Sequence, residues 1–145
     1  MLTSRHLGKI TNDYTKTTLG DVRVDLNIDN FAAMTQETID EVDRAIDALD
    51  ALRTAALASF TAALADDASP HDQVAKFWEF HHDEVDPELE RDQFVAALQL
   101  ARAGFYPDGD QFTILDFSVR GPQTDQLLVA RFNRDRSLDH VSWES

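Results

Sequence analysis

The chain has 145 residues, a hydrophobic fraction of 43% and a formal net charge of −14. This length and apolar content are typical of one domain with one core. Cysteine is absent, which excludes disulfides, thiolate metal sites and a cysteine nucleophile, and which fits a reducing compartment. No run of about 18 apolar residues is present, so no transmembrane helix is expected. The N-terminal residues lack the apolar segment of a signal peptide, and we therefore expect a cytoplasmic protein.

The negative charge is concentrated in the middle of the chain. Residues 37–92 hold sixteen of the 27 acidic residues but only four of the 13 Lys and Arg. An acidic surface repels nucleic-acid phosphates and anionic membranes, so neither is an expected partner. In one interpretation the charge serves solubility. In the other it speeds the encounter with a basic protein.

The first thirty residues predict strands. Residues 22–28 alternate apolar and polar side chains, which is the period-two pattern of a half-buried strand. A short edge strand is predicted over residues 7–10. The segment 17–20 predicts a hairpin back toward residues 7–14.

A long helix is predicted over residues 35–65. Thr35 suits the N-cap and Glu37 the first turn, where the helix dipole favours negative charge. Apolar residues recur at spacings of three and four as far as Leu64, which predicts a core-facing stripe. An acidic stripe lies beside it with only Arg44 as nearby compensation, and it consists of Asp40, Asp43, Asp47 and Asp50.

Two further helices are predicted before the last third of the chain. Residues 69–72 supply an N-cap, a first-turn proline and a capping-box acid for a helix that ends near Val85. The next helix would begin at residues 86–88 and end at Gly104. The junction carries a second acidic cluster, Asp83, Glu84, Asp86, Glu88 and Glu90.

Residues 111–145 carry the densest strand signal, with strands predicted over 112–119, 127–132 and 138–144. The predicted fold class is therefore α+β, as a single domain over residues 1–145. In it an antiparallel sheet, built from N-terminal strands and a C-terminal three-strand meander, packs against about three helices. The predicted order is β-β-α-α-α-β-β-β.

Four stretches follow a family pattern: VRVDLNIDN at 22–30, VAKFWEFHHDE at 74–84, ALQLARAGFYPDGDQFTILDFSV at 97–119 and QLLVARFNRDRSLDHVSWES at 126–145. With them the chain resembles the bacterial family catalogued as domain of unknown function two-thousand-and-four. The most specific matches are the turn at 104–107, the strand residues 116–118 and the terminal residues 143–145. The resemblance implies no established reaction, cofactor or catalytic residue. By analogy of type, small acidic domains of this kind include toxin-neutralising immunity proteins.

The residues that could support catalysis or metal binding form no convincing constellation. His81, His82, Asp83 and Glu84 are the only local cluster of metal-ligand types. Adjacent helical residues point about 100° apart, so the two histidines cannot chelate as an i, i+4 pair would. We expect His81 to be a core histidine hydrogen-bonded to a neighbour. No nucleophile elbow and no phosphate-binding glycine loop is present, so neither an enzyme nor a cofactor is predicted.

Asp116 stands out as an acid inside an otherwise apolar strand. It could face solvent, pair with an arginine such as Arg131 across the sheet, or belong to a site. We favour the structural pair.

Two functions fit these features. The first is an acidic protein-binding domain, most specifically an immunity-type inhibitor that masks a basic surface of a toxin or enzyme. Its predicted partner-binding residues are Asp40, Asp43, Asp47, Asp50, Asp83, Glu84 and Asp86. The alternative is a housekeeping or small-ligand-binding domain with a groove between helices and sheet near Trp78, Phe105 and Tyr106.

Overall fold

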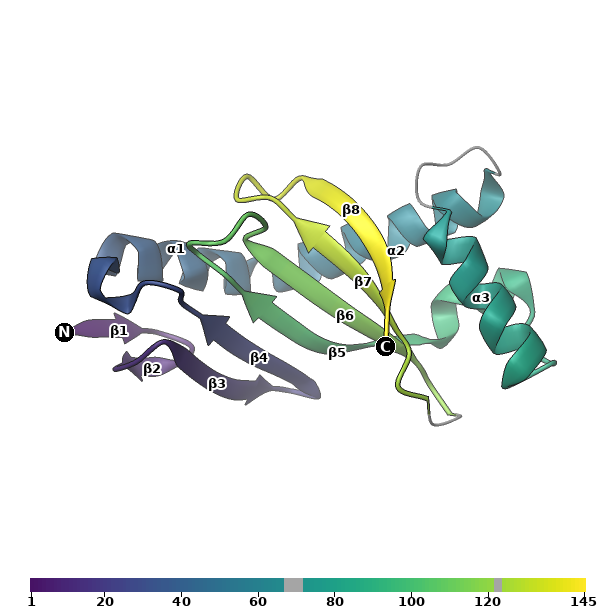
Figure 1. Cartoon of the computed structure of the whole chain (residues 1–145), viewed down its shortest axis with the longest axis horizontal. Coiled ribbons are helices and arrows are strands. Elements are labelled where there is room, and N and C mark those ends of the chain that lie inside the picture. The colour runs from purple at the N-terminus through teal and green to yellow at the C-terminus, as the bar shows by residue number, and fades with distance from the viewer. Residues whose placement is uncertain (67–71, 122–123) are drawn as a thin grey trace.

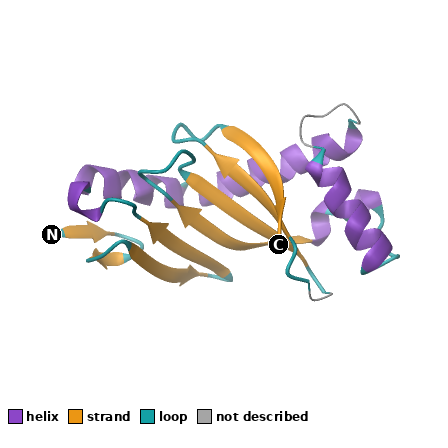
Figure 2. Cartoon of the chain, in the orientation of Figure 1, coloured by secondary structure: helices purple, strands orange, loops and turns teal. Residues whose placement is uncertain are grey.

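The computed structural model of the chain describes residues 1–66, 72–121 and 124–145. In these ranges four strands, three α-helices and four further strands follow one another along the chain (Figures 1 and 2). This confirms the predicted α+β class and the predicted order of strands, helices and strands. The helices are α1 (Gln36–Asp47), α2 (Leu49–Ala65) and α3 (Gln73–Glu84). The strands are β1 (Leu2–Ser4), β2 (Gly8–Ile10), β3 (Tyr14–Leu19), β4 (Val22–Asn27), β5 (Leu98–Phe105), β6 (Thr113–Val119), β7 (Leu127–Phe132) and β8 (Leu138–Glu144).

Six of the strands form one sheet in the order β3-β4-β5-β6-β7-β8. Every neighbouring pair is antiparallel except β4 and β5, which are parallel. The predicted sheet was antiparallel throughout, and this one pair differs because all three helices lie between β4 and β5 in the chain. A long connection of this kind can return the chain to the same end of the sheet and so align two strands.

The N-terminal strands pair differently from the prediction. β1 pairs with β2, and β3 pairs with β4 through a tight turn in which Gly20 has a φ of +60°. The predicted hairpin from residues 17–20 toward residues 7–14 is therefore wrong. Local pairing around Gly20 prevails because a positive φ, which glycine adopts without a steric penalty, matches the twist of a two-residue hairpin turn.

The predicted first helix is two helices. Thr35 is its N-cap as predicted, since its hydroxyl accepts the Thr38 backbone N–H at 3.3 Å. Ala48 then leaves the helical region with φ −89° and ψ 7°, and α1 and α2 meet there at a bend of 57°. No single helix in the described ranges is long and apolar enough to cross a membrane, and α1 with α2 passes that test only as a bent pair.

The predicted third helix, over residues 86–104, is wrong. Two short 3-10 turns cover residues 91–97, and β5 follows directly. Its buried residues Leu98, Leu100 and Ala103 face the core once a bulge at Ala101 is allowed for. Their spacing fits the period of a helix as well as that of a strand. The segment is a strand because it pairs with β4 on one side and with β6 on the other.

The helices cover one face of the sheet and leave the other without a helix (Figure 2). In β6 the alternate residues Thr113, Leu115, Phe117 and Val119 are buried on the helix side, as the alternation predicted. Phe60 of α2 meets Phe117 edge-on at 5.3 Å between ring centroids. α3 packs against β8, with Phe77 and Trp143 in edge contact at 5.9 Å. The predicted start of this helix at Ser69 and Pro70 lies outside the described residues.

Candidate functional site

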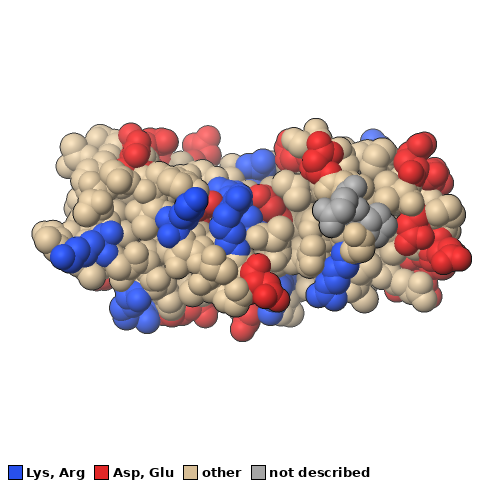
Figure 3. All heavy atoms as spheres, turned by 90° about the horizontal axis from the view of Figure 1, so that it is seen from below, with Lys and Arg blue, Asp and Glu red and all other residues tan. Residues whose placement is uncertain are grey.

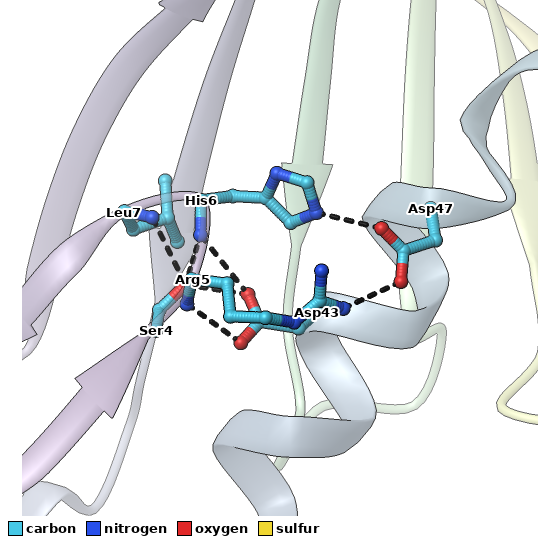
Figure 4. Close-up of polar contacts among 6 residues, drawn as sticks. All are labelled: Ser4, Arg5, His6, Leu7, Asp43 and Asp47. Carbon is cyan, nitrogen blue, oxygen red and sulfur yellow. Dashed lines mark hydrogen bonds and ion pairs between the residues drawn. The ribbon is translucent and has the colours of Figure 1, made fainter.

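The four aspartates of the predicted acidic stripe do not share one surface. Asp43 is buried, with 3% of its surface exposed. Its carboxylate accepts the Ser4 hydroxyl at 2.5 Å and the Arg5 backbone N–H at 2.9 Å (Figure 4). The Ser4 oxygen in turn accepts the backbone N–H groups of His6 and Leu7. Asp43 therefore holds the β1–β2 turn against α1 and contributes nothing to a partner surface.

Asp47 completes this attachment one helical turn further on. Its two oxygens contact the Arg5 guanidinium at 2.6 Å and the His6 Nε2 at 2.8 Å (Figure 4). The hydrogen bond from Arg5, followed by that from His6, lowers the pKa of Asp47. Ser4, His6 and Asp47 are residue types of a hydrolase triad, but the Ser4 hydroxyl donates to Asp43 and not to the imidazole. The geometry of nucleophilic catalysis is therefore missing here.

The remaining stripe residues also have partners within the chain. Asp50 pairs with Arg53 at 2.9 Å, and Asp40 accepts the side-chain amide of Gln36 at 2.8 Å. The expectation that Arg44 alone compensates the stripe is thus wrong. Arg53 lies three residues from Asp50 in the sequence, but the partners of Asp47 come from the N-terminal hairpin, which sequence spacing could not place beside α1.

The second predicted acidic surface differs because its carboxylates form no ion pairs with the described residues. We call it the acidic end, and it comprises the carboxylates from the second half of α3 to the 3-10 turn at Arg91–Gln93: Glu79, Asp83, Glu84, Asp86, Glu88, Glu90 and Asp92. Residues 79–92 thus hold seven acids and a single base, Arg91. Within the described residues none of the seven forms an ion pair, and all except Asp86 are exposed. Figure 3 shows acidic side chains gathered at the end of the molecule that carries α3.

The backbone that carries the acidic end is held in place by two partly buried donors, Trp78 and Arg91. The Trp78 indole N–H donates to the Leu89 carbonyl at 2.9 Å, and the ring of His82 stacks on it at 5.1 Å. Arg91 does not neutralise the carboxylates, because its guanidinium donates to the Leu64 carbonyl at 2.5 Å and 3.1 Å and lies over the Trp78 ring. The acids therefore project from a fixed framework.

His81 is a core residue, as predicted. It is 1% exposed, and its Nδ1 lies 2.9 Å from the Phe77 carbonyl. A carbonyl only accepts, so Nδ1 carries the proton, and Nε2 is left to accept the Thr124 hydroxyl at 3.3 Å. In the described part of the chain no group of three or more His, Asp and Glu side chains could hold a metal ion.

A buried ionic cluster lies on the helix-free face of the sheet. Arg102 of β5 donates through Nε and Nη2 to both oxygens of Asp25, each at 2.7 Å, and Asp25 is 1% exposed. The same guanidinium donates to the Tyr106 hydroxyl at 2.5 Å and contacts Asp116 at 3.3 Å. Asp116 therefore pairs with Arg102 and not with Arg131. The sequence could not show this, because Arg102 was predicted to lie in a helix that ends at Gly104.

Burial and charge act in opposite directions in this cluster. Burial raises the pKa of Asp116 more than the nearby Arg102 lowers it. For Arg102, burial lowers the pKa, but the hydrogen bonds to Asp25 and Tyr106 outweigh it and the net pKa is raised. Gly104 makes the arrangement possible, since a Cβ there would lie 2.5 Å from the Arg102 Nη2. The contacts are satisfied within the chain, which is typical of a structural cluster.

The three aromatic residues of the alternative prediction lie in different settings. Phe105 is fully buried in the core, Tyr106 contacts Arg102, and Trp78 supports the acidic end. A pocket between helices and sheet does exist elsewhere, with a volume of about 770 Å³. It lies between the β3–β4 turn, the α1–α2 junction and the β5 bulge, and none of the three aromatic residues lines it.

The scan of protein-family models, the search of curated proteins and the search of solved structures each gave no match for this chain. The resemblance to the family named above therefore stays a prediction.

Proposed function

We propose that the chain is an acidic protein-binding domain whose acidic end docks onto a basic surface of a partner protein. One observation carries this proposal. Asp40, Asp43 and Asp47 of α1 are engaged by Gln36, Ser4, Arg5 and His6, whereas the carboxylates of the acidic end form no ion pair with any described residue. Of the two surfaces predicted from sequence, the first loses Asp43 to the interior and has partners within the chain at Asp40, Asp47 and Asp50, so we assign the docking surface to the second.

The energetics support the same assignment. Carboxylates placed side by side repel one another, by a few tenths of a kcal/mol for each exposed pair on a helix. The C-terminal end of α3 adds partial negative charge, because the carbonyls of its last turn point there. A basic partner relieves both terms. A net charge of −14 further speeds its approach at low salt.

The most specific form of the proposal is an immunity-type inhibitor that covers the basic cleft of a toxic enzyme, such as a nuclease. Such a protein needs no catalytic group of its own. The residues that remain assigned to the interface are Asp83, Glu84 and Asp86, together with their neighbours Glu79, Glu88, Glu90 and Asp92.

The test is to mix the purified protein with basic enzymes encoded beside its gene and to measure inhibition and affinity as salt increases. We expect saturable inhibition and an affinity that falls as salt is raised from about 0.05 to 0.5 M, because the charges lie at the surface. An affinity that does not change with salt would contradict the proposal.

Matched charge reversals locate the surface. A triple variant, Asp83→Lys, Glu84→Lys and Glu88→Lys, should weaken binding at least about tenfold, equivalent to 1.4 kcal/mol. The control reverses three exposed acids away from α3, Asp13, Asp21 and Asp110, and so makes the same change in net charge. If both variants lose affinity equally, net charge and not the acidic end is responsible.

A further inference from the structure

The pocket at the α1–α2 junction is created by two irregularities that meet there. Leu49 follows the break at Ala48, and Ala101 is the bulged residue of β5. A regular helix over a regular strand would leave no such space, because side chains on the two faces would interdigitate. Its volume of about 770 Å³ lies within the range of small-molecule sites. Bulges are also common beside binding sites, where they redirect a strand.

The pocket is lined by both apolar and charged residues. Its apolar residues are Leu19, Val22, Ile46, Leu49, Leu100 and Ala101. The carboxylates on the helical side already have cations: Asp47 contacts Arg5 and His6, and Asp50 contacts Arg53.

Arg120 differs from the other cation of the lining. It is exposed just after β6, and no carboxylate of the described residues pairs with it. Asp21, the other unpaired charge of the lining, belongs to the exposed β3–β4 turn, where an aspartate is an ordinary turn residue. Arg120 is therefore a cation of the lining that has no carboxylate partner among the described residues, and it is available to an anionic group.

From this geometry we propose that the pocket binds a small amphiphile with an apolar body and a carboxylate head. The apolar part lies against Leu49, Leu100 and their neighbours, and the carboxylate pairs with the guanidinium of Arg120. A planar guanidinium suits a carboxylate because two parallel N–H groups can donate to its two oxygens. This site is separate from the acidic end and does not depend on its function.

Three probes with the same eight-carbon chain test the head group: octanoate, octanol and octylammonium. Titrations followed by amide NMR shifts should show octanoate acting at millimolar concentration on residues 19–22, 46–53 and 99–101. Octanol should bind the same amides about tenfold more weakly, because it lacks the charge-assisted pair. If octylammonium shifts these amides at lower concentration than octanoate, or if octanoate shifts none of them, the proposal is overturned.

Two variants and a control assign the residues. Arg120→Gln should weaken octanoate about tenfold and leave octanol unchanged, since only the ion pair is lost. Arg44→Gln removes the same charge from an exposed position of α1 outside the pocket, and it should change neither. Ala101→Phe fills the space and should weaken all three probes. Equal loss of octanoate binding in the two arginine variants would overturn the role of Arg120.

Discussion

At the scale of single residues, two aspartates of the same helix differ in burial. Asp43 and Asp47 lie four apart on α1 and belong to one stripe in the sequence, yet one is buried under the β1–β2 turn and the other is half exposed beside it. The buried one has backbone and hydroxyl donors, and the other has charged side chains. Their contributions to stability should therefore differ.

Replacing Asp43 by Ala should lower the free energy of unfolding by about 1–3 kcal/mol, because the Ser4 hydroxyl and the Arg5 N–H lose a buried acceptor. Asp47→Ala removes only solvent-screened pairs and should cost much less. Urea unfolding measures both. Hydrogen exchange of residues 2–10 should accelerate in the first variant and stay near wild type in the second. Equal effects would show that the attachment does not depend on the buried carboxylate.

The two acids beside Arg102 should also differ in their contribution to the free energy of unfolding. Asp25→Asn breaks a buried bidentate pair and should cost about 3–5 kcal/mol. Asp116→Asn should be close to neutral at pH 7, because burial already disfavours the charge of Asp116.

The pH dependence gives an independent check on Asp116. Its pKa is raised in the folded state, so its contribution is fully present below the unfolded value near 3.9 and is lost as pH rises through the folded pKa. Wild type should therefore lose stability relative to Asp116→Asn as pH rises from about 3. The opposite slope would mean that Arg102 outweighs burial.

At the scale of elements, hydrophobic periodicity gave a wrong prediction for β5, which it assigned to a helix. The residues from Phe94 to Ala101 fit a helical stripe, and nothing local in the sequence opposes a helix. Pairing with β4 on one side and β6 on the other made the segment a strand. Gly104, predicted to end a helix, instead provides the room in which Arg102 crosses the strand.

Gly104→Ala tests that role. Its new methyl group would displace the guanidinium from Asp25, and we expect a loss of about 1–3 kcal/mol in urea unfolding. In an Asp25→Asn/Arg102→Met background the same substitution should cost much less, because no ion pair remains to be displaced. Additive effects in this cycle would exclude the proposed contact as the cause.

At the scale of the whole molecule, the acidic residues differ in whether they have partners within the chain. The N-terminal hairpin engages Asp43 and Asp47 of α1, and the acidic end stays without ion pairs in the part of the chain that the structure describes. A surface kept for a partner should reduce the stability of the free protein.

This loss of stability can be measured from the dependence of the melting temperature on salt concentration. Raising NaCl from about 0.01 to 0.3 M shortens the screening length severalfold and should raise the melting temperature of the free protein. Replacing Asp83, Glu84 and Glu88 by their amides should raise it at low salt and flatten the salt dependence. The amide variant of Asp13, Asp21 and Asp110 is the control, and it should show a smaller change. No difference between the two variants would mean that repulsion is spread over the whole surface.

The sequence by itself determined the α+β class, the order of elements, the meander from β6 to β8, the Thr35 cap and the burial of His81. These depend on short-range periodicity and capping, which neighbouring residues specify. Only the tertiary structure decided that residues 98–105 form a strand, that Arg102 pairs with Asp25 and Asp116, and that α1 bends away from α2. It also decided which acidic side chains have partners within the chain, because Arg5 and His6, which contact Asp47, lie about forty residues away from it in the sequence. Pairing partners across such distances are selected by the packing of the whole domain, and no local pattern encodes them.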